Sequence, residues 1–194
     1  EPDNKDDFKP GDTINIEAEV KNNANEDLDV LVEASLFDLT TSEEIEEAEA
    51  ENEIEEDEDL DFNLKIKIPT DNDEIKESHK YAIFVKASED NNENKHCSED
   101  SVDIEIELEK DDLLIKDVLM PLTAERGDFV SVAVNVMNIG TKDQDVYVKI
   151  TNSELKVDVK SNTFELEEFS DDNEITINSG FVVPDDAKDK DYNI

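Results

Sequence analysis

Apolar and polar residues alternate along much of this chain, and the alternation comes in short runs. In residues 13–20 the apolar positions are 14, 16, 18 and 20, and polar residues lie between them. The same period of two marks four further runs: residues 30–36, 60–68, 102–108 and 130–136. Successive side chains of a β-strand point to opposite faces, so each run is predicted to be a strand with one buried face.

Turn-forming residues separate these runs. They are concentrated in five stretches: PGD at 10–12, KNNANED at 21–27, PTDND at 69–73, SEDNNEN at 88–94 and NIGTKDQD at 138–145. Several short strands joined by such turns, without a strong helical pattern, are typical of an immunoglobulin-like β-sandwich. The predicted fold class is therefore all-β.

The chain also contains an internal repeat. Residues 9–39 and 125–155 align without a gap at a shift of 116. Identical residues meet at several positions of the alignment, among them Gly11 with Gly127, Asp12 with Asp128, Val20 with Val136, Asn22 with Asn138, and DV at 29–30 with DV at 145–146. We therefore expect two tandem immunoglobulin-like domains, residues 1–109 and 110–194, with a short linker near 109–112, as part of a longer array.

The two copies differ at their ends. The second has a strand pattern, LLIKDVLMP at 113–121, before its Gly-Asp turn, where the first has only EPDNKDDFK at 1–9. The first continues with YAIFVKAS at 81–88 and SVDIEIELE at 101–109, where the second has DYNI at 191–194. We expect the first domain to lack its first strand and the second to stop before its last. Flanking sequence of a longer array, or strand exchange with a neighbouring molecule, would cover the open edges.

An acidic block allows more than one interpretation. Residues 43–61 contain thirteen carboxylates and no cation. Glu and Ala favour a helix, and a block of like charge also suits a disordered tail. The second copy has an alternating, strand-like stretch in the corresponding place, residues 155–184. We therefore predict a strand over 48–54, with Ala48, Ala50 and Ile54 facing inward and a turn near 56–59. A helix is the alternative.

The net charge excludes several partners. The chain has 57 acidic and 18 basic residues, a formal net charge of −39, and a mean hydropathy of −0.70. Nucleic acid and anionic membrane surfaces are negatively charged and are bound through Lys and Arg side chains. Both would therefore repel this acidic chain. The sequence has no apolar run near 18 residues, so no segment is predicted to insert into a membrane. High charge also favours disorder, but the strand alternation outweighs it.

Residues suited to catalysis are few. His79 and His96 are the two histidines, and both lie in polar stretches. His96 and Cys97 could form a thiol nucleophile or a pair of metal ligands, but adjacent residues of an extended chain point apart and no second cluster completes a site. Cys97 is the single cysteine, so no disulfide forms within the chain. We predict that the protein is not an enzyme and requires no cofactor.

Calcium is the stronger candidate for a bound ion. Ca²⁺ takes six to eight oxygen ligands from carboxylates, amides and carbonyls. Two loops carry candidates: Asp71 and Asp73 in TDNDE at 70–74, and Asp90, Asn92, Glu99 and Asp100 in EDNNENKHCSED at 89–100. In an immunoglobulin-like topology these loops lie at opposite ends of one strand, so they would not share an ion. The alternative is that both are solvated acidic loops.

A resemblance to a known family extends this picture. KPGDTINIEAEVKNNANEDLDV and ERGDFVSVAVNVMNIGTKDQDVYVKI are each followed by IP or VP, a polar loop and a tyrosine. They resemble the CARDB-like immunoglobulin repeats of archaeal surface proteins. HCSEDSVDIEIE, read with the second of these stretches, is similar to archaeal S-layer proteins. The resemblance covers nearly the whole chain. The chain departs from such proteins in having no N-x-S/T glycosylation site.

The resemblance implies a structural role outside the cell, at the cell surface. The chain would belong to an S-layer or surface filament and would contact copies of itself, or other surface-layer proteins, through strand edges. One alternative is an adhesin or surface binding module, which an exposed aromatic or basic cluster at a loop tip would favour. Another is a pair of accessory domains of a secreted enzyme, which the flanking sequence would identify.

Overall fold

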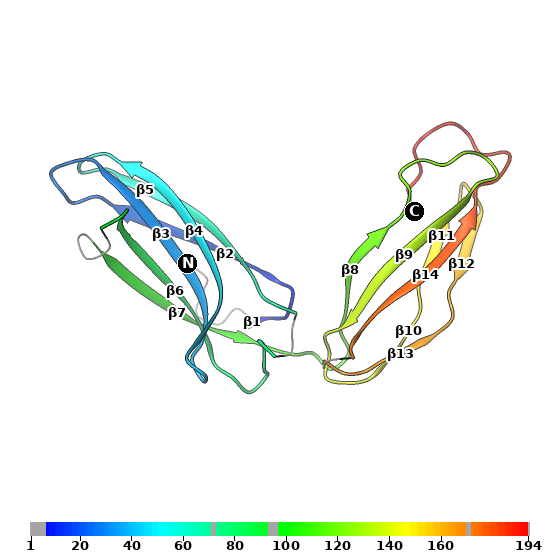
Figure 1. Ribbon diagram of the computed structural model, residues 1–194, viewed down its shortest axis with the longest axis horizontal. Coiled ribbons are helices and arrows are strands. Elements are labelled where there is room, and N and C mark those ends of the chain that lie inside the picture. Colours follow the sequence, from blue (N-terminus) through cyan, green and yellow to red (C-terminus); the bar gives the residue numbers. More distant parts are fainter. Residues whose placement is uncertain (1–6, 71–72, 93–96, 170–171, 194) are drawn as a thin grey trace. The chain divides into compact units, whose positions relative to one another are not determined.

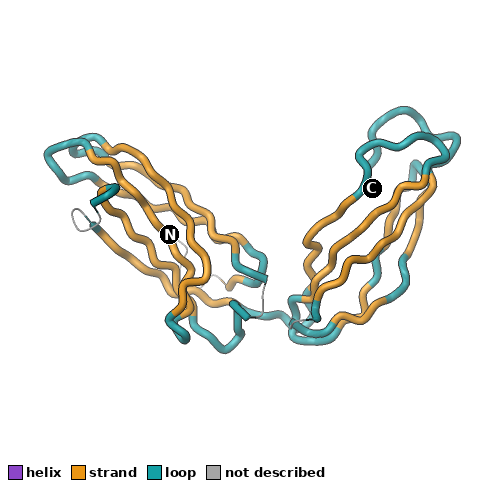
Figure 2. The backbone as a smooth tube through the Cα atoms, viewed as in Figure 1, coloured by secondary structure: helices purple, strands orange, loops and turns teal. Residues whose placement is uncertain are grey.

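The structure, a computed structural model, describes residues 7–70, 73–92, 97–169 and 172–193. These residues form β-strands and turns, and no helix occurs among them (Figure 2). The prediction of an all-β chain is therefore confirmed. The chain divides into two compact units, Glu1–Leu108 (unit 1) and Glu109–Ile194 (unit 2). Each unit is described by itself.

The described part of unit 1 forms seven strands in two sheets (Figure 1). The strands are β1 (Asp7–Phe8), β2 (Thr13–Lys21), β3 (Leu28–Asp38), β4 (Glu43–Ile54), β5 (Asp59–Lys67), β6 (Tyr81–Glu89) and β7 (Ser98–Ile106). One sheet has the order β1-β7-β6-β3-β4, and the other consists of β2 and β5. All pairs are antiparallel except β1 with β7, which is parallel.

The core of unit 1 lies between its two sheets. Ile16 of β2 and Leu64 of β5 are buried, as are Val32 and Leu36 of β3 and Ile83 of β6. In β2, β3 and β5 the buried residues occupy alternate positions, as the period of two predicted. Unit 1 is thus a β-sandwich-like body whose strands each bury one face.

The acidic block forms the strand β4. Its register with β3 places Ala48 opposite Ala34 and Ala50 opposite Val32. Ala48 and Ala50 are half-buried, Ile54 is 2% exposed, and the glutamates between them are exposed. The predicted strand is confirmed and the helical alternative is wrong. Pairing with β3 and burial of one face outweigh the helix propensity of Glu and Ala.

The Gly-Asp turns of the repeat have the same geometry in both units. Gly11 and Gly127 have φ values of 88° and 84°, a left-handed conformation that favours glycine. Each glycine N–H donates to a carbonyl of the strand end opposite, at 3.0 and 2.9 Å. The carboxylates of Asp12 and Asp128 accept hydrogen bonds from the backbone N–H three residues earlier, at 3.1 and 2.9 Å. The repeated dipeptide is therefore a turn determinant.

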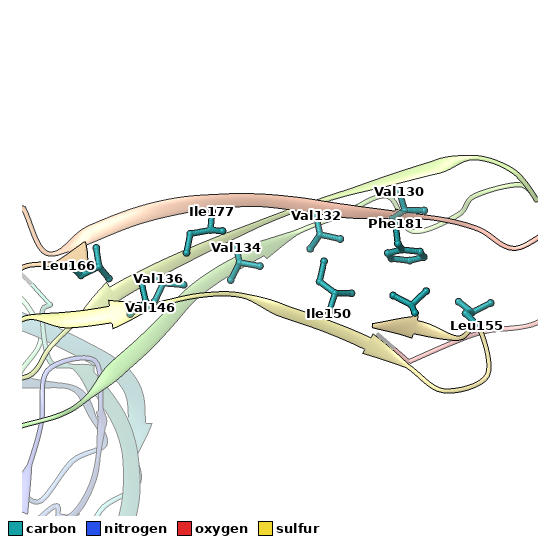
Figure 3. Packing of buried hydrophobic residues seen from close by; sticks show 11 residues of the cluster. Val130, Val132, Val134, Val136, Val146, Ile150, Leu155, Leu166, Ile177 and Phe181 are labelled. Atoms are coloured by element: carbon teal, nitrogen blue, oxygen red, sulfur yellow. The ribbon is translucent and has the colours of Figure 1, made fainter. Parts of the chain in front are cut away.

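Seven strands also occur in unit 2, counted over residues 109–169 and 172–193. They are β8 (Leu113–Leu119), β9 (Phe129–Asn138), β10 (Gln144–Val146), β11 (Lys149–Asn152), β12 (Val157–Lys160), β13 (Phe164–Leu166) and β14 (Glu174–Val182). One sheet has the order β14-β9-β8, and the remaining strands form the pairs β10-β13 and β11-β12. Figure 3 shows Val132 and Val134 of β9 on one side of the core and Val146 and Ile150 on the other. All four are buried.

The first strands of the two units pair differently. In unit 2, β8 pairs antiparallel with β9. In unit 1, the two-residue β1 pairs with β7 of the other sheet, and β2 pairs only with β5 among the described strands. Within the described part of unit 2, no strand corresponds to β6 or β7. No helix of the described residues is long and apolar enough to cross a membrane.

Candidate functional site

The first predicted calcium loop, residues 70–74, is partly described. Asp71 lies outside the described residues. The side chain of Asp73 is 86% exposed, and its carboxylate lies 3.8 Å from the ammonium group of Lys76. An exposed ion pair of this length contributes little to stability. Asp73 is thus placed on the surface of the loop, next to a cation.

The second predicted loop is shorter than the sequence suggested. Strand β7 begins at Ser98, so Glu99 and Asp100 belong to a strand and lie opposite Lys86 and Val85 of β6. The placement of these two acids in a loop is therefore wrong. Neighbouring residues of a strand point to opposite faces, so Glu99 and Asp100 do not converge on one ion. Pairing between β6 and β7 extends the strand to this point.

The rest of that loop also makes local contacts. The Asn91 amide donates to the carboxylate of Asp90, and the Asn92 amide donates to the carboxylate of Glu89 at 3.5 Å. Within the described ranges, no three His, Cys, Asp or Glu side chains come close enough together to hold a metal ion. Calcium binding by any of the six candidates, Asp71, Asp73, Asp90, Asn92, Glu99 and Asp100, stays a prediction.

One buried polar pair was not predicted from the sequence. Nδ1 of His79 lies 2.6 Å from Oδ2 of Asp38, whose side chain is 5% exposed. The other oxygen of Asp38 accepts hydrogen bonds from the backbone N–H groups of Thr40 and Thr41, at 2.7 and 3.2 Å. Burial alone would raise the pKa of Asp38, but the hydrogen bonds from His79 and the two threonines hold it below 3.8.

This pair holds the turn after β3 against the chain before β6. An aspartate that orients a histidine is also part of catalytic triads, in which the histidine activates a hydroxyl or thiol. No hydrogen bond connects His79 to Ser, Thr or Cys in the described part of the chain. Cys97 is exposed, and its predicted partner His96 lies outside the described residues. What the contacts of Asp38 show is a link between His79 and the turn at Thr40 and Thr41.

A buried asparagine clamps each unit at the position matched by the repeat. Asn22 is 2% exposed, and its amide donates to three backbone carbonyls at 2.8 to 3.2 Å. Asn138 is 0% exposed and donates to the carbonyls of Lys142 and Glu167, both at 2.7 Å. In both units the side-chain oxygen accepts a backbone N–H two residues later. Each asparagine thus ties the turn that follows its strand to a turn some 30 residues away.

Each unit also contains a tyrosine whose hydroxyl hydrogen-bonds to the backbone just upstream. Tyr81 OH accepts from the N–H of Lys76 at 2.7 Å and donates to its carbonyl at 3.0 Å. Tyr192 OH makes the same two bonds with Lys188, at 2.8 and 3.0 Å. Burial raises the pKa of Tyr81 above 10.0, outweighing its bond to Lys76. The sequence repeat pointed to both tyrosines. It did not show what they do, because their hydrogen bonds to the backbone are visible only in the structure.

The outer face of unit 1 is strongly acidic. The exposed side chains of β4 include Glu47, Glu49, Glu51 and Glu53. Strand pairing sets Glu49 opposite Glu33 and Glu53 opposite Asp29, and like charges in such positions repel each other. Lys86 lies 3.4 Å from Glu33 and offsets part of this repulsion. Such a face attracts dissolved cations and repels other anionic surfaces.

Comparison with known proteins does not assign the chain to a family. No family model matches it, and no curated protein matches it. It is weakly similar to the crystal structure of red sea bream transglutaminase, at 12% identity and a TM-score of 0.35, covering 92% of this chain and 26% of that one. It is also weakly similar to the Bacillus subtilis sporulation control protein Spo0M, at 11% identity and a TM-score of 0.36, covering 93% and 87%. The chain thus spans about a quarter of the transglutaminase. Similarities this weak assign neither a family nor an activity.

Proposed function

We propose that this chain is a structural part of an archaeal cell-surface assembly, an S-layer or surface filament. In this proposal its two units are tandem immunoglobulin-like domains of the CARDB-like type. The chain acts outside the cell, without catalysis and without a required cofactor. Its partners are copies of itself or other surface-layer proteins, which it meets through strand edges.

The observation that carries the proposal is the recurrence of three structural contacts in the same order along both units. Both units contain the left-handed Gly-Asp turn, the buried asparagine clamp and the backbone-bonded tyrosine. A tyrosine of this kind, at the corner leading into a strand, is a feature of immunoglobulin-like sandwiches. The residues that the repeat preserves thus hold the fold, which supports a module used for its shape.

The acidic surface supports the same role. Exposed acidic strands repel each other at low salt and approach each other when cations screen or bridge them. Lateral contacts in a surface layer would then depend on the cations of the medium. This dependence distinguishes a charged structural layer from a neutral array of the same domains.

Labelling of intact cells tests the proposed location. Antibodies raised against the purified chain are applied to intact and to permeabilised cells of the source organism, with immunogold detection. We expect regular label over the outer surface of intact cells. Label that appears only after permeabilisation would contradict a surface role. Sparse label at isolated points, rather than over the whole surface, would favour an adhesin.

A further inference from the structure

A groove runs along one side of unit 1, between the edge of β2 and strands β6 and β7. Its apolar lining consists mainly of half-buried side chains, which are Ala18, Val20, Val85, Ala87 and Val102. These residues belong to the inward-facing rows of their strands, which are fully buried elsewhere in the unit. The core of unit 1 is therefore left partly uncovered along this side.

Along the edge of β2 beside this groove, the backbone groups pair with no other described strand. The N–H of Asn22 donates to the carbonyl of Glu58 at 2.9 Å, which fixes the phase of the β2-β5 ladder. In an antiparallel pair, the backbone N–H and C=O groups of successive residues point alternately toward the partner strand and away from it. The backbone groups of Glu17, Glu19 and Lys21 therefore point away from β5. Among the described strands, β2 has no other partner.

Unit 2 shows what occupies the matched edge. There, β8 pairs with residues 133–138 of β9. The repeat shift of 116 converts these positions to residues 17–22, of which 17–21 belong to β2 and line the groove. With β8 in place, Val134 and Val136 are 6% and 7% exposed, whereas their counterparts in unit 1 are only half-buried.

The charge of the groove restricts what can enter it. Among the described residues, its charged lining consists of Glu17, Glu19, Asp61, Glu99 and Asp100, with Lys21 as the one cation. A strand without net negative charge is therefore favoured. β8, with the sequence LLIKDVL, is neutral. By sequence, residues 1–6 (EPDNKD) carry three acids and no apolar alternation, so they do not match this requirement.

We propose that this groove is the docking site for one β-strand of a separate polypeptide, which pairs antiparallel with β2. The strand is neutral or basic and carries apolar residues in the pattern of β8. In β8 the residues opposite Val136 and Val134 are Ile115 and Val118. Their equivalents in the docked strand would lie opposite Val20 and Ala18. The proposal deepens the proposed function, since it names the strand edge and the chemistry of the partner.

The partner is another module rather than a second copy of this chain. The β8 strand of a second copy is already paired with its own β9 and would have to leave it. The residue of unit 1 equivalent to Gly140 is Ala24, and Gly140 packs against the backbone of Lys110 and Asp112. A methyl group at that position obstructs the same approach, so the docked strand begins at the equivalent of Leu113.

A peptide of the β8 sequence tests the proposal on the whole chain. The peptide LLIKDVLMP, with two added lysines for solubility, is titrated into ¹⁵N-labelled protein, and amide hydrogen exchange is measured by NMR. We expect exchange at Glu17, Glu19 and Lys21 to slow about tenfold when the peptide is at ten times its Kd. Ala18 and Val20, whose amides already face β5, should change little. The permuted peptide LIVLLKDMP, with the same two lysines, should leave all five unchanged.

Matched variants locate the binding. Ala18→Glu places a carboxylate in the groove and should abolish the protection. Asn15→Glu changes an exposed position of the same strand outside the groove and should retain it. If Ala18→Glu lowers protection throughout unit 1, Glu19→Pro serves instead, because it removes an N–H that faces the open edge without breaking a bond to β5.

Four results would overturn the proposal. The first is absence of protection at millimolar peptide, and the second is equal protection by the permuted peptide. The third is protection of the three amides in the free chain at any dilution, which would assign the edge to a segment of the same chain. The fourth is protection that rises with protein concentration together with a doubled mass, which would assign it to a second copy. Cell-surface labelling can fail while the peptide binds, so the two proposals fail separately.

Discussion

The two units share one repeat but differ widely in charge. Residues 1–108 contain 37 acidic and 9 basic side chains, a net charge of −28, and residues 109–194 contain 20 and 9, a net charge of −11. In unit 2, Lys116 lies 2.7 Å from Glu174 and Lys149 lies 3.1 Å from Asp158. The bond from Lys116, with that from Asn135, lowers the pKa of Glu174. In unit 1, acidic residues of β3 and β4 face each other instead.

The asparagine clamps that the two units share are buried, and the acidic row in which they differ is exposed. Asn22 and Asn138 lie inside their units and make equivalent bonds, whereas the acidic row of β4 points to solvent. Exposed substitutions change the free energy of unfolding little, while buried polar groups must keep their partners. One fold can therefore carry very different surfaces. The predictions below test this division between a common interior and a variable exterior.

The largest effect is expected at the asparagine clamps. Asn22→Ala or Asn138→Ala removes donors from buried carbonyls and should lower the free energy of unfolding of its own unit by about 2–4 kcal/mol. Urea denaturation followed through the NMR signals of each unit measures this. Asn15→Ala, at an exposed position, is the control and should cost less than about 0.5 kcal/mol. Equal losses in the free energy of unfolding for the control and the clamp variants would show that the buried asparagines do not stabilise each unit.

A smaller effect is expected at a position where the two units differ. A methyl group on Gly140 would lie 2.8 Å from the backbone nitrogen of Asp112 and 3.0 Å from the carbonyl oxygen of Lys110. Gly140→Ala should therefore destabilise unit 2 by about 1–3 kcal/mol, as overpacking does. The reverse change in unit 1, Ala24→Gly, should cost about 1 kcal/mol or less. Thermal unfolding of both variants provides the measurement, and a neutral Gly140→Ala would mean that the segment before β8 is not held there.

The two tyrosines should contribute unequally to the free energy of unfolding. Tyr81 is 1% exposed, so Tyr81→Phe leaves the backbone groups of Lys76 without a partner in a buried place and should cost about 1–2 kcal/mol. The bonds of Tyr192 are exposed to water, and Tyr192→Phe should cost less than about 0.5 kcal/mol. Urea denaturation of the two variants compares them. A larger loss for Tyr192→Phe would reverse this ranking and show that burial does not set it.

Salt should raise the free energy of unfolding of the two units unequally, and by less than the substitutions above change it. Raising NaCl from about 0.01 M to 0.15 M shortens the screening length from about 30 Å to 8 Å. Unit 1, with the higher charge and the facing acids, should gain about 0.5–1 kcal/mol more than unit 2. Hydrogen exchange at both salt concentrations reports each unit. An equal gain would mean that the acids of β4 do not repel each other measurably.

The effect of calcium on the melting temperature compares the matched acidic loops of the two units. If the predicted loops bind it, millimolar CaCl₂ should raise the melting temperature more than NaCl of matched ionic strength. Asp71→Asn combined with Asp73→Asn should reduce that difference, and Asp185→Asn combined with Asp186→Asn in the matched loop of unit 2 is the control. Identical shifts from both salts would remove calcium as a ligand and leave the carboxylates as a charged coat.

The sequence by itself determined the strands and the repeat. A period of two is visible without any partner, because it follows from the geometry of a single strand. The acidic strand β4 was also accessible, since the second copy shows the same position with ordinary residues. The start of β7 was missed, because EDNNENKHCSED contains no apolar alternation before Val102. Pairing with β6, from Ala87 onward, decided that Glu99 and Asp100 are strand residues.

Only the tertiary structure decided what the polar residues do. Asp38 and His79 are 41 residues apart in the sequence, and Asn22 and Ile54 are 32 apart. No local sequence pattern therefore predicts either contact. The choice of partner for the first strand was equally hidden, since β1 and β8 both precede a Gly-Asp turn yet join different sheets. A strand pattern specifies which face is buried, but the backbone groups at its edges are alike in every sequence. Which edge pairs with which is therefore decided by the packing of the whole unit.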